Sequence, residues 1–205
     1  MQTMRKLVVL SFISLDGVMQ APGGPDEDTS DGFMYGGWTW PLSDDFSGDL
    51  LMDQMNHDFE LLLGRKTYDI FASYWPSASD ENPIAVKFNK TKKYVLSRTL
   101  KKAEWNNSVI ISTNVPEEIR KLKNTDGPEL QVHGSGNMIQ TLLKNDLVDE
   151  LWLKIFPVLL GSGKKLFEEG IVAGSYTLTD CKSTATGVIF ANYKRAGEVK
   201  TGSFA

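Results

Sequence analysis

The sequence predicts a three-layer α/β/α fold on a mostly parallel central sheet, with an antiparallel hairpin at its C-terminal end. Short apolar segments alternate with segments of helical pattern along most of the chain. Such alternation is typical of parallel sheets whose connecting helices cover both faces. Two alternating segments, residues 176–183 and 188–194, then follow each other across a break at 184–187, and they predict the hairpin.

Each expected strand is a short apolar run, and the expected helices carry start signals. Ser43 followed by Asp44 and Asp45 suits a helix start, because such side chains cap the first turn. Pro116 also suits a first helical turn. We expect strands at residues 7–13, 59–63, 93–97, 109–112, 130–132 and 150–156. We expect helices at residues 43–56, 65–74, 116–123 and 133–143, with a turn-rich connection at 75–83.

Composition limits the class of protein. The 205 residues are 41% hydrophobic with a net charge of -4, which suits one domain spanning residues 1–205. An isoelectric point near 5.3 argues against a general nucleic-acid-binding protein. Cys181 is the single cysteine, which excludes an intrachain disulfide and a cysteine-based zinc cluster. Because His57 and His133 match no common ligand spacing either, we expect no metal site.

The start of the chain bears on localisation. Arg5 and Lys6 precede an apolar run, as in a signal peptide, but Asp16 follows that run at once and no small-residue cleavage motif is present. No apolar run approaches the roughly 20 residues of a membrane-spanning helix. We therefore expect a cytoplasmic protein, and a single cysteine fits a reducing compartment.

Charge is distributed unevenly along the chain. Residues 16–60 hold eleven acidic and no basic residues, whereas residues 85–105 hold seven basic residues and one acid, Glu104. Chance clustering on solvated faces is the simpler interpretation. The alternative is that the two stretches face different ligands.

The first candidate binding motif lies at residues 132–138. A predicted strand runs into a glycine-rich turn of Gly134, Ser135, Gly136 and Asn137, which opens a helix. Glycine lets a ligand approach the backbone closely, and the first N–H groups of a helix attract an anion. The motif could cradle a pyrophosphate, or it could be a tight turn that binds nothing.

A second motif follows the strand at residues 59–63. Gly64 leads into Arg65, Lys66 and Thr67 at a helix start, where cations oppose the helix macrodipole. An anionic ligand would relieve that conflict, although a solvent-facing Arg-Lys pair is the alternative.

The third motif comprises Ser97 and Arg98, at the end of the strand at residues 93–97. Ligands of open α/β sheets bind at the carboxyl ends of the strands, so the three motifs together favour a phosphate-containing ligand more strongly than any one of them.

Five segments together resemble a known family in their order and spacing. They are residues 14–17 (SLDG), 64–68 (GRKTY), 94–98 (YVLSR), 133–136 (HGSG) and 149–163 (DELWLKIFPVLLGSG). The chain resembles the dihydrofolate reductase superfamily over residues 6–194. It is most similar to the branch of the C-terminal reductase domain of bacterial riboflavin biosynthesis (RibD) proteins.

The resemblance implies a dihydrofolate-reductase-like fold and NADPH as the cofactor. It implies that Arg65, Lys66 and Thr67 hold the 2′-phosphate and pyrophosphate, and that Ser97 and Arg98 flank the adenosine. Arginine grips phosphate in bidentate fashion, which would favour NADPH over NADH. The remaining cofactor-binding residues implied are Gly64, Gly134, Ser135, Gly136 and Asn137.

Four residues are candidates for contact with the substrate, and each has a structural alternative. Asp16 ends the first strand and is our first candidate for substrate binding or proton delivery; the alternative is a turn carboxylate. Asp49 lies on the helix where dihydrofolate reductases place a pterin-binding carboxylate, or it is a solvated helix residue. Trp38 and Trp40, in the long loop at residues 18–42, could wall a flat substrate or form the core of the loop.

The expected function is reduction of a small, heterocyclic, pterin- or pyrimidine-like substrate. It would be similar to 5-amino-6-(5-phosphoribosylamino)uracil reductase or dihydrofolate reductase. The substrate of the former is phosphorylated, and Lys154, Lys164 and Lys165 could supply the cation that residues 16–60 lack. The alternatives are a non-catalytic NADPH- or nucleotide-binding module and an enzyme acting on another phosphorylated nucleotide.

A homodimer is also expected. Trp152, Phe156 and Phe190 lie in the β-rich C-terminal part and would offer an apolar surface at a sheet edge. Such edges are usually covered or paired, and two-fold dimers are the commonest oligomers.

Overall fold

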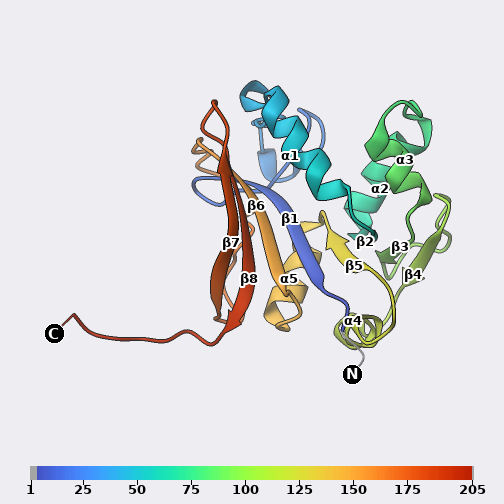
Figure 1. Ribbon diagram of the computed structural model, residues 1–205. Helices are drawn as coiled ribbons and strands as arrows, with labels where there is room; N and C mark the ends of the chain where they lie inside the picture. The colour runs from blue at the N-terminus through green and yellow to red at the C-terminus, as the bar shows by residue number, and fades with distance from the viewer. Residues whose placement is uncertain (1–3, 205) are drawn as a thin grey trace.

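The computed structural model describes residues 4–204, whose eight strands form one sheet in the order β4-β3-β2-β5-β1-β6-β8-β7 (Figure 1). The strands are β1 (Leu7–Ser14), β2 (Phe59–Gly64), β3 (Lys93–Leu96), β4 (Ser108–Ile111), β5 (Glu129–Val132), β6 (Glu150–Phe156), β7 (Ser175–Ser183) and β8 (Ile189–Gly197). The α-helices are α1 (Asp45–Met55), α2 (Arg65–Tyr74), α3 (Pro83–Lys90), α4 (Val115–Lys123) and α5 (Gly136–Lys144).

The pairing of the strands confirms the predicted fold class. Strands β1 to β6 pair in parallel, and β8 pairs antiparallel with both β6 and β7. Parallel strands end at the same edge of a sheet. The turns that follow β1, β2, β3, β5 and β6 therefore share one edge, and three of them carry the predicted phosphate motifs. None of the helices within residues 4–204 is long and apolar enough to cross a membrane.

Helix α3 was not predicted. Our expected connection at residues 75–83 contains only a short 3-10 turn, Trp75–Ser77, before this helix begins. Asn82 caps α3, because its Oδ1 accepts hydrogen bonds from the N–H groups of Ile84 at 3.0 Å and Ala85 at 3.3 Å. Proline follows at the first helical position, so the cap and the proline were a start signal that we missed.

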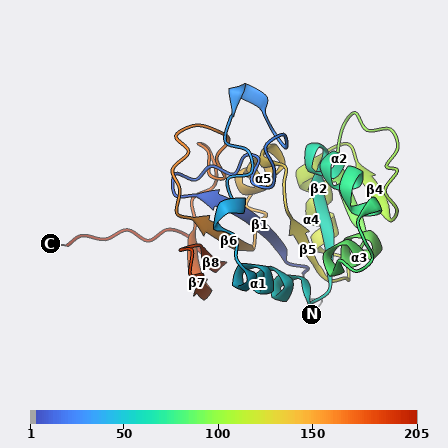
Figure 2. The same ribbon diagram turned by 90° about the horizontal axis from the view of Figure 1, so that it is seen from above.

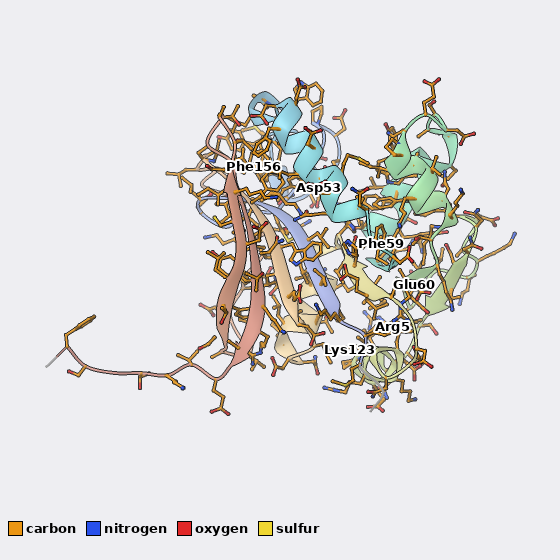
Figure 3. All side chains as sticks on the ribbon, in the orientation of Figure 1. Arg5, Asp53, Phe59, Glu60, Lys123 and Phe156 are labelled. Atoms are coloured by element: carbon orange, nitrogen blue, oxygen red, sulfur yellow. The ribbon has the colours of Figure 1, made fainter. Side chains whose placement is uncertain are left out.

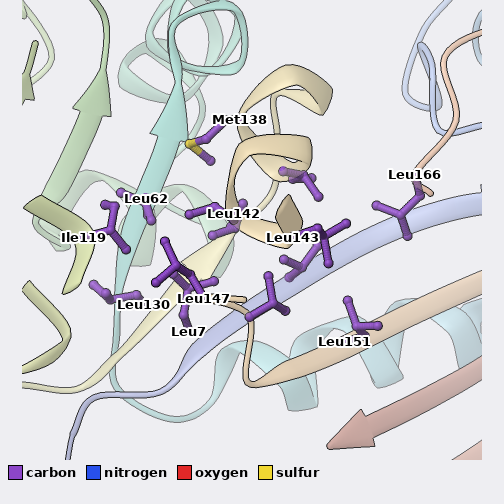
Figure 4. Close-up of a cluster of buried hydrophobic side chains, with 14 of the residues drawn as sticks. Leu7, Leu62, Ile119, Leu130, Met138, Leu142, Leu143, Leu147, Leu151 and Leu166 are labelled. Carbon is purple, nitrogen blue, oxygen red and sulfur yellow. The ribbon is translucent and has the colours of Figure 1, made fainter. Parts of the chain in front are cut away.

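Helices cover both faces of the sheet because the strand side chains alternate in direction. On one face, Leu7 and Val9 of β1 pack with residues of α4 and α5, such as Ile119 and Leu142 (Figure 4). On the other face, Val8 belongs to the apolar cluster that receives residues of α1, α2 and α3. Figure 2 shows β1 and β6 lying between α5 on one side and α1 on the other.

Ion pairs join the segments at the amino ends of the strands, where Figure 3 labels Arg5, Glu60 and Lys123. The Arg5 guanidinium is buried, contacts the Glu60 carboxylate at 2.5 Å and donates to the Pro128 carbonyl at 2.6 Å. Lys123 at the end of α4 contacts the Asp149 carboxylate at 2.6 Å. Charged contacts thus close the edge opposite the predicted site, which leaves the carboxyl edge for ligand binding.

The apolar side chains expected at a dimer surface are covered within the chain. Phe156 and Phe190 are only 3% and 5% exposed and belong to a core cluster under the loop at residues 18–42. Trp152 is partly buried, and its Nε1 donates to Glu150 at 3.0 Å. A dimer would therefore have to use other residues, and the dimer stays a prediction.

The turns after β2 and β5 touch through glycine backbones. The N–H of Gly64 donates to the carbonyl of Gly134 at 3.0 Å. A Cβ at Gly64 would lie 2.7 Å from the backbone nitrogen of Ser135, and one at Gly134 would lie 2.5 Å from Oγ1 of Thr67. Both distances are shorter than van der Waals contact, so the two turns meet this closely only because both residues are glycines.

We predict opposite effects on stability for two glycine-to-alanine substitutions. Gly64→Ala should lower the free energy of unfolding by about 1–3 kcal/mol, because the added methyl overpacks a contact between backbones. Gly48→Ala is the matched control, because Gly48 is exposed in α1 and its Cβ would meet nothing within 4 Å. That change should raise the free energy of unfolding by about 0.4–1 kcal/mol. Urea denaturation measures both, and equal effects would contradict the proposed contact.

Candidate active site

A cavity of about 380 Å³ opens at the carboxyl edge of the sheet. Its lining comes from β1, the loop after β1, α1, α2, α3, the turn between β5 and α5, and β6. The predicted phosphate motifs after β2 and β5 meet at one end of it. The rest of the lining is mainly apolar.

The end with the predicted phosphate motifs, called the phosphate end below, is built from two helix starts. Lys66 and Thr67 come from the first turn of α2, and Gly134, Ser135 and Gly136 come from the turn that opens α5. The Ser135 side chain makes no capping hydrogen bond to α5, so it leaves the first N–H groups of that helix to a ligand. An uncapped helix start lined with glycine suits a phosphate group.

Asp28 bridges two lysines at the rim of this end. Its carboxylate contacts Lys66 Nζ at 2.5 Å and Lys164 Nζ at 2.8 Å, and it also accepts a hydrogen bond from Ser30. Partial burial alone would raise the pKa of Asp28, but these hydrogen bonds outweigh it and hold the pKa well below the usual range. Asp28 is therefore an anion that bridges the two lysines, and the three groups together carry one net positive charge.

The rest of the cavity, called the aromatic end below, has apolar and aromatic walls. Helix α1 contributes Leu51 and Met55, while α2 and α3 contribute Phe71 and Phe88. The rings of Phe71 and Phe88 stack with their centroids 5.6 Å apart, and Trp75 packs edge-on against Phe88 at 5.1 Å. Such walls favour a flat ring as the ligand.

Two bases, the buried Lys154 and the partly exposed His133, line the cavity beside these walls. Lys154 of β6 is only 1% exposed, and burial lowers its pKa to about 7. His133 follows β5 and is held by Gln131 Oε1 at 3.3 Å from its Nε2. Burial, together with the nearby Lys154, lowers the pKa of His133 to about 3, so the imidazole is neutral at physiological pH.

Glu27 is a half-buried carboxyl group in the same lining. It accepts a hydrogen bond from the N–H of Gly23 at 2.6 Å. Burial raises the pKa of Glu27, and the neighbouring Asp28 charge adds to the effect. Neither Glu27 nor Asp28 was a candidate from the sequence, because both sit in a loop whose path the sequence does not predict.

The predicted cofactor residues divide into three groups. Lys66, Thr67, Gly134, Ser135 and Gly136 line the cavity. Directly behind the lining lies Gly64, against Ser135. The remaining ones, Arg65, Ser97, Arg98 and Asn137, lie outside the lining.

Those outer residues occupy the same edge of the sheet. The Arg65 Nε donates to both carboxylate oxygens of Asp69, at 2.8 and 2.7 Å. Ser97 is buried, and its Oγ accepts from the N–H of Leu100 at 3.0 Å. Arg98 and Asn137 are exposed. Their roles in cofactor binding stay predictions.

Asp16 lies outside the cavity lining and anchors a loop. Its carboxylate accepts hydrogen bonds from Ser14 Oγ at 2.6 Å and from the N–H groups of Leu160 at 3.2 Å and Gly161 at 2.8 Å. The bond from Ser14 contributes most to lowering the pKa of Asp16 below its usual value. An ionised carboxylate with both oxygens occupied matches the turn role that was the alternative, and its role in proton delivery stays a prediction.

The other substrate candidates also lie away from the cavity. Asp49 is exposed on α1, two residues before the cavity-lining Leu51, so the two side chains point to different sides of the helix. Trp38 is buried under the loop, where its Nε1 donates to the Gln20 carbonyl at 2.8 Å and its ring packs edge-on against Phe156. Trp40 is 80% exposed. We expected these three residues to contact the substrate. Trp38 instead packs in the loop, and Asp49 and Trp40 face solvent.

Comparison with known proteins identifies relatives along most of the chain. The family model of the RibD C-terminal domain matches residues 5–190. The uncharacterized protein YyaP of Bacillus subtilis (strain 168) is 29% identical over 188 residues, covering 90% of this chain and 92% of YyaP. The uncharacterized protein YwjB of the same organism is 25% identical over 170 residues, covering 80% of this chain and 84% of YwjB.

Solved structures share the fold. A Shewanella sp. PV-4 protein whose name assigns it to riboflavin biosynthesis is 24% identical, with a TM-score of 0.64 over 93% of this chain and 99% of the other. A pyrimidine reductase-like protein of Corynebacterium diphtheriae is 14% identical, with a TM-score of 0.59 over 95% and 93%. Dihydrofolate reductase of Enterococcus faecalis, complexed with NADP(H), is 14% identical, with a TM-score of 0.59 over 93% and 96%. These likenesses confirm the dihydrofolate-reductase-like fold.

We predict an acid-dependent contribution of Asp28 to stability. At neutral pH, Asp28→Asn should lower the free energy of unfolding by about 1 kcal/mol, because it weakens hydrogen bonds to a partly exposed charge. The folded protein lowers the pKa of Asp28, so this contribution is present above a pH of about 4 and is lost as the pH falls further.

Urea denaturation at pH values between about 6 and 3 measures that difference, which should shrink as the pH falls. Asp26→Asn, an exposed position in the same loop, is the control and should have little effect at any of these pH values. A difference for Asp28→Asn that stays constant down to pH 3 would show that the ion pairs do not hold in solution.

Proposed function

Because this chain belongs to the family of RibD C-terminal domains, we propose that it is an NADPH-dependent reductase of a small, flat, pterin- or pyrimidine-like heterocycle. The observation that carries the proposal is a single cavity of about 380 Å³ with two chemically different ends. One end offers a lysine and a helix start to phosphate, and the other offers aromatic walls to a ring. A reductase needs both, since the protein must position a cofactor against its substrate and exclude water.

The phosphate end fits the pyrophosphate of a dinucleotide. Gly134 and Gly136 allow close approach to the backbone, and the N-terminus of α5 favours negative charge. Lys66 and Thr67 add a cation and a hydroxyl from the facing helix start. When bound, NADPH would supply the hydride for reduction.

A preference for NADPH over NADH rests on two arginines outside the cavity lining. Strands β2 and β3 pair in parallel with Gly64 opposite Leu96, so Arg65 and Arg98 follow neighbouring strand ends. The pair of Arg65 with Asp69 is exposed and one helical turn long, and such pairs contribute little to stability. A 2′-phosphate could therefore compete for Arg65 through a charge-assisted hydrogen bond.

Activity separates a reductase from a binding module. NADPH absorbance is followed with dihydrofolate, dihydropterin and pyrimidine acceptors. Loss of absorbance that requires both protein and acceptor would support reduction. Tight NADPH binding without turnover of any such acceptor would instead favour a non-catalytic nucleotide-binding module.

We predict that NADPH binds more tightly than NADH and that Arg65 contributes to the difference. Arg65→Ala should weaken NADPH binding about tenfold and NADH binding by less than about twofold, since only NADPH carries the 2′-phosphate. Fluorescence titration at moderate salt measures both affinities. Arg120→Ala, on the exposed part of α4, is the matched control for a lost positive charge. Equal losses for the two cofactors would remove Arg65 from the 2′-phosphate site.

We also propose that two copies of the chain pair through the β7 edge. Strand β7 ends the sheet, its side chains are largely exposed, and Leu178 and Ile189 of the hairpin are 49% and 39% exposed. Light scattering at micromolar concentration should give twice the chain mass of 22.8 kDa. Leu178→Lys should convert the dimer to a monomer, and a wild-type mass of one chain would rule the dimer out.

A further inference from the structure

Lys154 is almost wholly buried, and its ammonium group has no hydrogen-bonding partner among residues 4–204. Among the residues that the structure describes, none forms a hydrogen bond or an ion pair with its Nζ. Lysine is almost never fully buried unless it is paired. Its position in a cavity wall indicates that the missing partner belongs to a ligand.

Two other buried lysines of this protein show the usual arrangement. Lys93 donates to three backbone carbonyls, at 2.7, 3.2 and 3.4 Å. Lys123 donates to the Leu147 carbonyl at 2.9 Å and to Asp149 at 2.6 Å. Lys154 is thus an exception among the buried lysines of the described chain, and the exception lies in the candidate site.

The direction of the Lys154 side chain follows from strand alternation. Lys154 pairs with Phe12 of β1 and shares its face of the sheet, where Leu10 and Phe12 also line the cavity. Its Nζ lies 5.9 Å from the centre of the Phe12 ring. Its charge also disfavours protonation of His133, which lines the same cavity.

The other charged groups of the cavity are engaged elsewhere. Asp28 is bound by Lys66 and Lys164 at the rim. Glu27 accepts its hydrogen bond from the loop backbone. The aromatic end therefore presents one unpaired amine beside a neutral imidazole, in apolar surroundings.

We propose that Lys154 binds an anionic oxygen of the substrate, which is a flat heterocycle that carries one negative charge on a group such as a carboxylate or an acidic enol. This proposal names the substrate class of the proposed reductase and rests on that function. The aromatic walls select a flat body. One amine neutralises one charge, whereas a phosphate monoester carries nearly two charges and needs several donors.

Binding of such an acid must depend on pH. The free amine has a pKa of about 7, and a bound anion stabilises its charged form and raises that pKa. Affinity is therefore full below pH 7 and falls as the pH rises above it, by about tenfold between pH 6 and pH 8. At pH 8 binding should take up nearly one proton.

The test uses 2-naphthoate as the probe, with uncharged 2-naphthamide for comparison. Calorimetry in two buffers of different ionisation enthalpy gives the affinity and the proton uptake at each pH. Lys154→Met keeps the length of the side chain and removes the charge, and it should abolish naphthoate binding while leaving naphthamide unaffected. Lys165→Met is the matched control, because Lys165 is exposed and adjacent to the rim. Glu27→Gln should keep the pH dependence, which separates the titration of Glu27 from that of Lys154.

The outcomes separate this proposal from the proposed function. NADPH is titrated against the same variants, and Lys154→Met should bind it as the wild type does. Failure of the wild type to bind millimolar naphthoate, or a flat pH profile, would overturn the anion site while leaving NADPH binding intact. If the wild type binds naphthoate but not NADPH, the proposed reductase function would be overturned while the anion site would stand. Lys154→Met removes a buried charge, so its stability should not fall.

Discussion

The contact between the Gly64 and Gly134 backbones sets the geometry of the whole site. The hydrogen bond of 3.0 Å joins the turn after β2 to the turn after β5, although about 70 residues separate them in the sequence. Without a side chain at either glycine, the start of α2 and the start of α5 come together. This brings Lys66 and Thr67 against the turn that opens α5, and neither helix start alone would form a phosphate end.

The same arrangement leaves a cavity whose two ends differ in how strongly water screens their charges. At the rim, Asp28 pairs with two lysines in partly solvated surroundings, and an exposed ligand phosphate can compete with such pairs. At the aromatic end, Lys154 and His133 are removed from water, and burial lowers the pKa of both. Charge at that end is costly unless a ligand neutralises it, so the aromatic end selects its ligand more strictly.

The sequence predicted the fold more completely than the site. Alternation of apolar runs predicted seven of the strands closely, including β6 at its observed bounds, whereas α3 was missed despite the cap at Asn82. At the site, the glycine-rich turn and Lys66 were identified because helix starts have local signals. Trp38 and Asp49 were chosen for their residue type, and the structure places one in the loop core and the other in solvent.

The sequence by itself determined the order of elements, the parallel sheet and the two helix starts that form the phosphate end, because periodicity, glycine and capping residues act over a few positions. Only the tertiary structure decided which polar groups face the cavity. In the sequence, Lys154 is one alternating strand position among others. Its isolation from polar partners depends on Phe12, His133 and α1, which come from distant parts of the chain. Burial and the absence of a partner are properties of the packed molecule, since they are set by everything that surrounds the amine.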